Sequence, residues 1–240
     1  MKYYRTLGAN TEYINQTKLY NKKDALLALL LYVVMTLTFI LMGKHFIQKS
    51  TLTEPYIFCF TGIISLVCIS IVLSICFIRK QQLITVGFSK TNAKKSFILG
   101  TILLLIIVIL KVIIPVVNGS VTIRTDLGQI LMNIVYYLIF IAFMEELVFR
   151  GFIGTRLFGY FRNKLFSIIV VGILFAVLHI PFQMIVAQVS FSQYISDNMG
   201  ILVNIFFWHF IKQWLYARYN SIIAPTMLHF IMDFIGWFII

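Results

Sequence analysis

The sequence has little charge. Only 12% of its 240 residues are charged and 60% are hydrophobic, whereas soluble domains have roughly 25% charged and 45–50% apolar residues. This composition excludes a soluble globular protein. Several uncharged runs reach about 18 residues or more, the length that a membrane-spanning helix needs, and lysines and arginines gather between them. The chain is therefore predicted to lie in a membrane.

Cysteine is also scarce, and several common motifs are missing. Cys59, Cys68 and Cys76 share one apolar segment without a Cys-x-x-Cys pair or a neighbouring histidine, which excludes a disulfide framework or a zinc knuckle and leaves packing as their role. The His-Glu-x-x-His helix of common zinc proteases is absent. The net charge of +12 forms no basic stripe with interleaved aromatic residues, so we expect no nucleic-acid partner.

The uncharged runs predict an all-α polytopic bundle of about seven spans. We expect these at Ala25–Phe46, Pro55–Ile78, Ser96–Val117, Leu127–Tyr160, Leu165–Phe182, Met199–Tyr216 and Ser221–Ile240. The chain then divides into a polar, mostly basic N-terminal segment (1–24), three N-terminal spans (25–126) and a core that carries the chemistry (127–240). The first span lacks a small-residue cleavage pattern, so we expect it to be retained as an anchor.

The basic residues predict the orientation in the membrane. If the chain crosses the membrane at each span, successive connections lie on opposite sides. Sorted in this way, 16 of the 20 lysines and arginines fall on one side, Arg150, Arg156 and Lys212 among them. By the positive-inside rule this side is the cytoplasm, with the N-terminus inside and the C-terminus outside a cell membrane. The segment Gln183–Gly200 has no basic residue and is expected to be an external loop, an interfacial helix or a re-entrant piece. Such a segment could gate a peptide substrate, although an ordinary loop is the simpler interpretation.

Six ionisable residues lie inside three of the predicted spans: Glu145, Glu146, Arg150, His179, His229 and Asp233. Ionisable groups at membrane depth are costly and usually face a polar interior, so function is the default hypothesis. A lone histidine such as His209 is instead expected to be a hydrogen-bonding packing residue.

Helix geometry divides the roles within the cluster. Glu145 and Glu146 point roughly 100° apart, so we expect them to serve different partners. Arg150 follows Glu146 at the spacing that favours an ion pair. This pair is predicted to be structural, which leaves Glu145 as the working carboxylate and general base.

The remaining spacings bring the histidines toward Glu145. Glu145 and His179 each lie 17 residues from Arg162, so a hairpin that turns there places the two at one level. Phe175 is one turn before His179 and can pack against its ring. His229 and Asp233, four residues apart, share one helix face. Counted from the helix ends, we expect the site to lie within the membrane toward the cytoplasmic leaflet.

Glu145-Glu146-x-x-x-Arg150, Phe175-x-x-x-His179 and His229-x-x-x-Asp233 together resemble the three ordered motifs of the CAAX-protease and bacteriocin-processing family, also called the Abi family. Phe149-Arg150-Gly151, Pro181 and the segment 221–225 are similar as well, and the resemblance covers about 127–240. It implies an intramembrane endopeptidase in which Glu145 and His179 activate water, while His229 and Asp233 help to bind the substrate carbonyl or its oxyanion. Members act in processing prenylated proteins, peptide maturation, quorum signalling or bacteriocin self-immunity.

One motif position departs from the family pattern, and both the use of a metal and the function have alternatives. The last motif position is often asparagine in the family, whereas an ionised Asp233 cannot donate a hydrogen bond and is expected to hold His229, leaving that histidine as the oxyanion donor. Glu145, His179 and His229 could also form a catalytic zinc site, but we favour a metal-free, glutamate-dependent peptidase. The alternative function is a non-catalytic membrane immunity or scaffold protein that uses the cluster structurally; a transporter is weaker, because no inverted repeat is evident.

Overall fold

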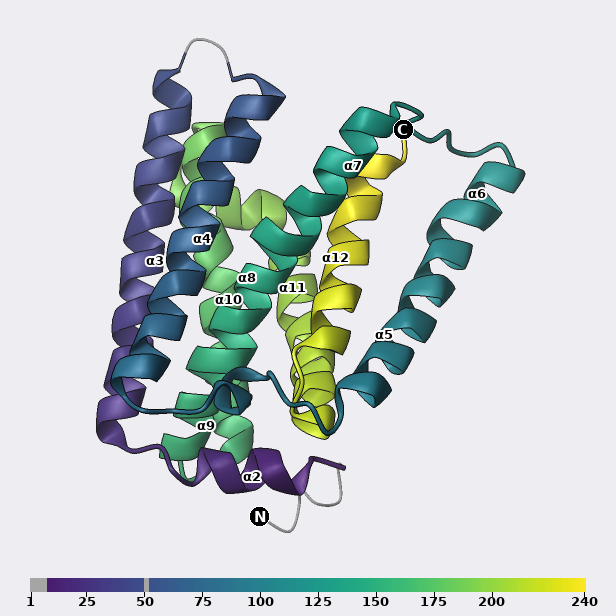
Figure 1. Ribbon diagram of the computed structural model, residues 1–240. Helices are drawn as coiled ribbons and strands as arrows, with labels where there is room; N and C mark the ends of the chain where they lie inside the picture. Colours follow the sequence, from purple (N-terminus) through teal and green to yellow (C-terminus); the bar gives the residue numbers. More distant parts are fainter. Residues whose placement is uncertain (1–7, 50–51) are drawn as a thin grey trace.

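The computed structural model describes residues 8–49 and 52–240, and this part of the chain is helical, with two isolated β-bridges and no strand. Short helix α2 (Thr11–Thr17) lies across one end of a bundle of long helices (Figure 1). The long helices are α3 (Lys22–Gln48), α4 (Glu54–Ile78), α5 with its continuation (Ala93–Val117), Leu127–Tyr160, α10 (Lys164–Ala187), α11 (Phe191–Tyr219) and α12 (Ile223–Phe238).

Local sequence explains where these helices begin and end. The side chain of Asn21 accepts hydrogen bonds from the backbone at the start of α3, and Asp24 completes a capping box. Asn163 and Ser190 cap α10 and α11 in the same way. Helix α11 ends at Asn220, which adopts the left-handed conformation that asparagine tolerates. Polar residues therefore mark the helix ends, while the apolar runs set the helix lengths.

Each of the seven predicted spans overlaps one of these helices, and the all-α polytopic fold is confirmed. Among the described residues, five helices are long and apolar enough to cross a membrane: α3, α4, Ala93–Val117, Leu127–Tyr160 and α10. Helix α11 is more polar, and α12 has only 16 residues. Helix α2 and the C-terminal end of α12 lie at opposite ends of the bundle (Figure 1). The span count of seven and the orientation stay predictions.

The interpretation of Gln183–Gly200 as an ordinary loop is wrong, because most of this segment is helical. Helix α10 continues past Pro181 to Ala187, and α11 begins at Phe191, so only residues 188–190 separate them. A proline inside a membrane helix is tolerated when neighbouring groups compensate for its missing N–H. The chain reverses at Gln188, which has a positive φ of 55°.

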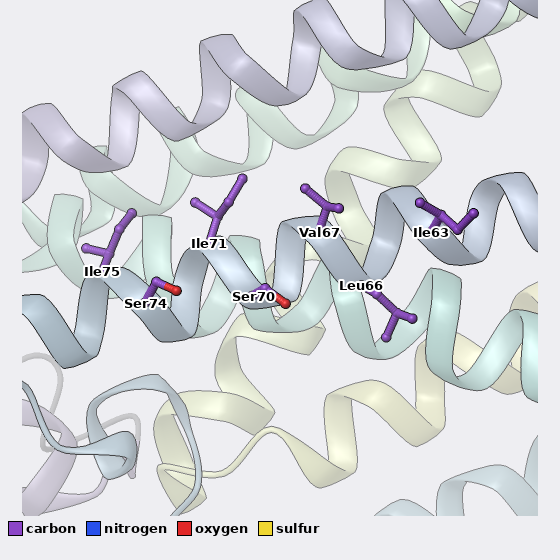
Figure 2. Close-up of a pocket in the computed structure, with 7 residues that line it drawn as sticks. All are labelled: Ile63, Leu66, Val67, Ser70, Ile71, Ser74 and Ile75. Atoms are coloured by element: carbon purple, nitrogen blue, oxygen red, sulfur yellow. The ribbon is translucent and has the colours of Figure 1, made fainter.

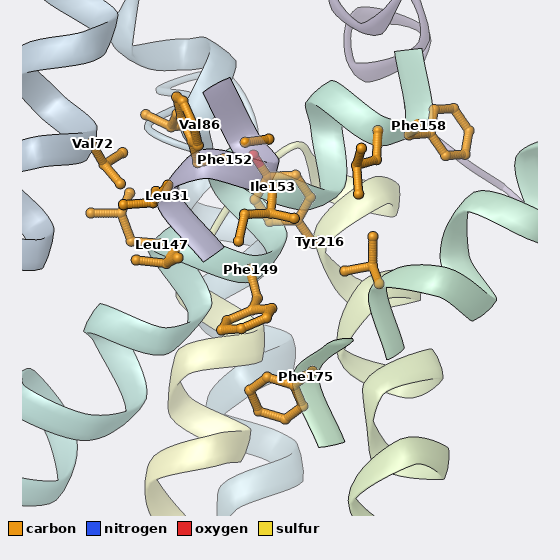
Figure 3. Close-up of a cluster of buried hydrophobic side chains, with 14 of the residues drawn as sticks. Leu31, Val72, Val86, Leu147, Phe149, Phe152, Ile153, Phe158, Phe175 and Tyr216 are labelled. Carbon is orange, nitrogen blue, oxygen red and sulfur yellow. The ribbon is translucent and has the colours of Figure 1, made fainter. Parts of the chain in front are cut away.

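Helix Leu127–Tyr160 lies at the centre of the bundle, between the α3–α4 pair and α12, with α5 outermost beside α12 (Figure 1). Its second half is buried in the largest apolar core, where it meets α3, α4, α10 and α11. Phe149, Phe152 and Ile153 lie in this core with Phe175 of α10 and Tyr216 of α11 (Figure 3). This packing fixes the second half of the central helix against α10 and α11, while α12 packs against its first half.

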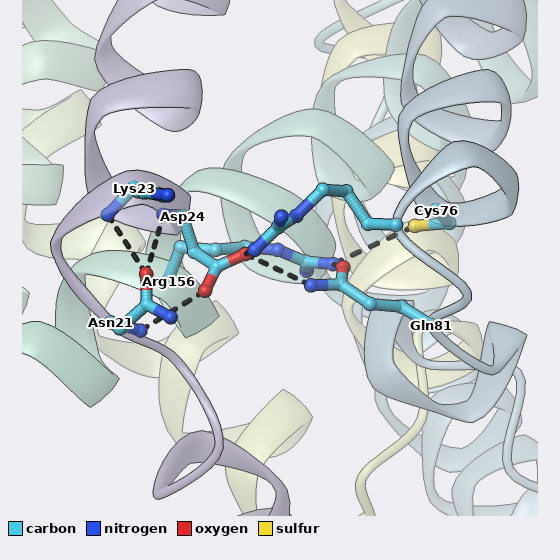
Figure 4. A network of polar contacts seen from close by, with 7 residues as sticks. Asn21, Lys23, Asp24, Cys76, Gln81 and Arg156 are labelled. Carbon is cyan, nitrogen blue, oxygen red and sulfur yellow. Dashed lines mark hydrogen bonds and ion pairs between the residues drawn. The ribbon is translucent and has the colours of Figure 1, made fainter.

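A second polar network ties the connections to the central helix at the α2 end. The buried guanidinium of Arg156 donates to the Gly151 carbonyl (2.9 Å) and to Oε1 of Gln81 (2.6 Å), and Gln81 donates in turn to Asp24 (3.0 Å; Figure 4). Arg156 also stacks on Tyr20, whose hydroxyl donates to the Thr85 carbonyl. Burial raises the pKa of this hydroxyl, and the neighbouring Arg156 lowers it. The network holds the α4–α5 connection in place.

Candidate active site

The paired glutamates occupy a single α-helical turn, Met144–Glu146, between two π-helical stretches, Tyr136–Phe143 and Leu147–Gly154. Such wide turns inside α-helices are rare and frequent at functional sites. The Glu146 side chain is fully buried and Glu145 is 7% exposed. Both carboxylates therefore lie in the interior of the bundle.

Glu146 is surrounded by positive groups. Its Oε1 atom lies 3.1 Å from Nη1 of Arg150, 3.6 Å from Nζ of Lys212 and 2.7 Å from Nδ1 of His229. The predicted Glu146–Arg150 ion pair is confirmed, and both side chains are buried completely. Because an isolated buried carboxylate is costly, these contacts make Glu146 the structural centre of the cluster.

Both ring nitrogens of His229 face carboxylate groups. Nδ1 meets Glu146, while Nε2 lies 3.3 Å from Oδ2 of Asp233 and 3.7 Å from Oε2 of Glu145. The expectation that Glu145 and Glu146 serve different partners is wrong, because the two nitrogens of one imidazole reach both. A neutral imidazole has one N–H, whereas the doubly protonated ring can donate on both sides.

His179 is held by its own helix. Its Nδ1 atom lies 2.8 Å from the Phe175 carbonyl oxygen and must donate to it, because a carbonyl can only accept. In the neutral ring, Nε2 therefore carries the lone pair. The predicted packing of Phe175 against His179 is confirmed by an edge-on contact with ring centroids 4.9 Å apart. The Arg150 guanidinium covers the Phe175 ring at 4.2 Å.

Four residues of the cluster line one cavity of about 750 Å³. Its acidic and basic lining residues are Glu145, His179, Lys212, His229 and Asp233, and most of its other walls are apolar. The walls reach Phe46, Leu52 and Ile57 beside the α3–α4 turn, at the end opposite α2. A separate hollow of about 450 Å³ on α4 is lined by Ile63, Leu66, Val67, Ser70, Ile71, Ser74 and Ile75, none of them ionisable (Figure 2).

The sequence interpretation missed Lys212. It assigned this lysine, with Arg150 and Arg156, to a basic cytoplasmic boundary, yet Lys212 is 4% exposed and the two arginines are fully buried. The available signal was the position of Lys212 within an apolar stretch, three residues after His209. His209 packs between helices as predicted, since a Cβ added at Gly172 would lie 2.9 Å from its ring, but the expected hydrogen bond is absent because neither ring nitrogen has a partner among the described residues.

The sequence left open a zinc site formed by Glu145, His179 and His229. Within the part of the chain that the structure describes, no three His, Cys, Asp or Glu side chains are grouped as metal ligands. Glu145 and His229 approach each other, but both nitrogens of His229 face carboxylates. The choice of a metal-free mechanism stays a prediction.

Residues 127–235 match the family model described as type II CAAX prenyl endopeptidase Rce1-like. The segment is similar to this Rce1-like family. The Rce1-like segment begins at the predicted core and contains the paired glutamates, Phe175, His179, His229 and Asp233. The three N-terminal spans lie outside it. The Rce1-like match supports a CAAX-protease-like peptidase in a lipid bilayer. No curated protein and no solved structure matches the chain.

Proposed function

We propose that this protein is an intramembrane endopeptidase that hydrolyses a peptide bond of a membrane-associated peptide or protein. The observation that carries this proposal is the shared cavity: Glu145 and His179 lie in one chamber whose other walls are largely apolar. A polar reaction centre inside an apolar chamber suits cleavage of a substrate that arrives from the bilayer. The Rce1-like match provides independent support.

Glu145 is the proposed general base. Its Oε2 atom is buried and has no hydrogen-bond partner in the structure, so it can accept a proton from a water in the cavity. Nε2 of His179 can accept a hydrogen bond from the same water and orient it. The water oxygen then attacks the carbonyl carbon, and the π electrons of the C=O bond move to the oxygen. When the tetrahedral intermediate collapses, the C–N bond breaks and the leaving nitrogen takes the proton from Glu145.

His229 contributes charge to this step. Its Nε2 atom is 3.7 Å from Glu145 and 3.3 Å from Asp233, so a positive imidazole ring lies beside the reacting groups. Asp233 fixes the ring, as expected from its spacing. The predicted donation from His229 to the oxyanion requires one ring N–H to leave its carboxylate partner.

The substrate is proposed to be apolar along the chamber. Phe46, Leu52 and Ile57 line the cavity beside the α3–α4 turn, and an extended peptide or a lipid-modified chain can lie against them. Peptide maturation, signalling and bacteriocin self-immunity are the roles that the resemblance suggests. We keep the cell membrane and a cytoplasmic-side site as predictions, although the cavity extends toward the α3–α4 turn.

The test is mass spectrometry of peptides released by cells or proteoliposomes that contain the wild type or Glu145→Gln. We expect a set of cleavage products that the variant does not release while it still inserts and folds. Glu54→Gln is the matched control, because Glu54 is exposed at the start of α4. Full biological function of both Glu145→Gln and His179→Ala would instead favour the immunity or scaffold protein.

A further inference from the structure

Lys212 is a buried cation that the proposed hydrolysis does not use. Its side chain, on α11, is 5% exposed, and it lines the same cavity as Glu145, His179 and His229. Among the described residues that line this cavity, it is the only lysine or arginine. A positive charge in this position attracts electron-rich groups of a molecule bound in the cavity.

The contacts of Lys212 leave its donors available. The nearest carboxylate oxygen, Oε1 of Glu146, is 3.6 Å from Nζ, which is an ion-pair distance but too long for a hydrogen bond. That oxygen already has closer contacts with Arg150 and His229. The ammonium also lies 5.0 Å from the Phe175 ring centre, a cation–π contact that uses no acceptor oxygen. An ammonium has three N–H groups, and a buried one is stabilised by an additional acceptor.

The other charged groups of the cluster are less suited to hold an oxyanion. Both ring nitrogens of His229 face carboxylates, and an ionised Asp233 can only accept. Arg150 lies behind Phe175 and does not line the cavity. Lys212 is therefore the cavity's cationic donor that is not committed to a short contact.

The geometry also places Lys212 opposite the proposed base. Lys212 and Nδ1 of His229 contact the same oxygen of Glu146, whereas Glu145 approaches Nε2 on the other side of the ring. A carbonyl group beside the imidazole can thus have its oxygen toward Lys212 and its carbon toward the water activated by Glu145.

We propose that Nζ of Lys212 donates a hydrogen bond to the carbonyl oxygen of the scissile peptide bond and stabilises the oxyanion formed when water attacks. The proposal rests on the proposed peptidase function and deepens it. It makes Lys212 a catalytic residue and assigns the donor role that Asp233 does not fill. The interaction strengthens as negative charge develops on the oxygen, so it acts mainly on kcat.

The first measurement compares Lys212→Met, Lys212→Arg and wild type on a peptide found to be cleaved by the wild type. Removing one oxyanion donor costs roughly 10²–10³-fold in kcat, and we expect a loss of this size in Lys212→Met with KM changed less than about threefold. Lys212→Arg keeps donors and should recover part of kcat. Thermal unfolding in detergent checks that both variants are folded.

The second measurement uses the same peptide with sulfur in place of the scissile carbonyl oxygen. Sulfur accepts hydrogen bonds poorly, so the thioamide should be cleaved much more slowly by the wild type and lose little further rate in Lys212→Met. An equal oxygen-to-sulfur rate ratio in wild type, Lys212→Met and Lys212→Arg would overturn the proposal. So would full turnover by Lys212→Met while Glu145→Gln is inactive, and that outcome leaves the peptidase function standing. A wild type that cleaves no peptide overturns both.

Discussion

Nδ1 of His229 lies 2.7 Å from Oε1 of Glu146, so α12 is joined to the central helix through two buried groups. The same oxygen contacts Arg150 of its own helix and Lys212 of α11. One carboxylate thus connects three helices of the Rce1-like segment. Its neighbour Glu145 is the proposed general base.

This relationship predicts a large effect of Glu146→Gln on stability. The variant leaves Arg150 and Lys212 buried without their carboxylate, and breaking a buried ion pair typically costs about 3–5 kcal/mol. We expect a marked drop in Tm measured in detergent micelles. In the double variant Glu146→Gln/Arg150→Met one unpaired charge is also gone, so its Tm should lie above that of Glu146→Gln. A double variant less stable than the single one would contradict this explanation.

The Arg156 network predicts a structural role outside the site. Arg156→Leu removes hydrogen bonds to Gly151 and Gln81 and leaves buried acceptors unsatisfied, at a cost of about 3 kcal/mol or more. Arg162→Leu is the control, because Arg162 is exposed in the following turn, and surface changes are usually within about 0.5 kcal/mol. Thermal unfolding of the two variants should separate clearly. Equal Tm values would show that Arg156 does not anchor the α4–α5 connection.

Gly159 predicts how closely α2 must approach the central helix. A Cβ at this position would lie 2.2 Å from the carbonyl oxygen of Thr17, so Gly159→Ala should push α2 away and cost about 1–3 kcal/mol. Gly200→Ala is the matched control, because no atom lies within 4 Å of its Cβ position. That change should leave stability equal or raise it by up to about 1 kcal/mol. Limited proteolysis near residues 17–21 should increase only in Gly159→Ala.

Chelation tests the choice between a glutamate and a metal mechanism. Because both nitrogens of His229 face carboxylates, we expect peptide cleavage to continue in excess EDTA. Elemental analysis of the active protein should show no stoichiometric zinc. Stoichiometric zinc, with activity lost on its removal and restored on its return, would overturn the metal-free mechanism.

The sequence was sufficient for the helices and for much of the cluster. Uncharged runs and spacing predicted the seven long helices, the Glu146–Arg150 pair and the packing of Phe175 on His179, because these depend on local helix geometry. Contacts between helices were harder. Neighbouring residues on a helix point roughly 100° apart, which suggested separate partners for Glu145 and Glu146. An imidazole ring has a nitrogen on each side, so His229 contacts both, and this common contact was missed.

Basic residues produced the other errors. The positive-inside rule considers a lysine or arginine only as a topological marker, so Lys212 and Arg156 were assigned to a boundary. In the folded chain both are buried, because partners from distant segments, such as Glu146 and Gln81, meet them there. The extension of α10 from Phe182 to Ala187 was missed because the polar Gln183 interrupts the apolar run, whereas in the fold its side chain accepts a hydrogen bond from Tyr194 of α11.

The wide turns on either side of Met144–Glu146 have a consequence for how the base is aimed. Side-chain direction on a helix depends on winding, and each residue added to or removed from a turn rotates the later side chains by roughly 100°. A local change from π to α winding next to the glutamates would therefore redirect Glu145 without a shift of the helix axis. The direction of the proposed base therefore depends on the local pitch of the backbone as much as on its neighbours.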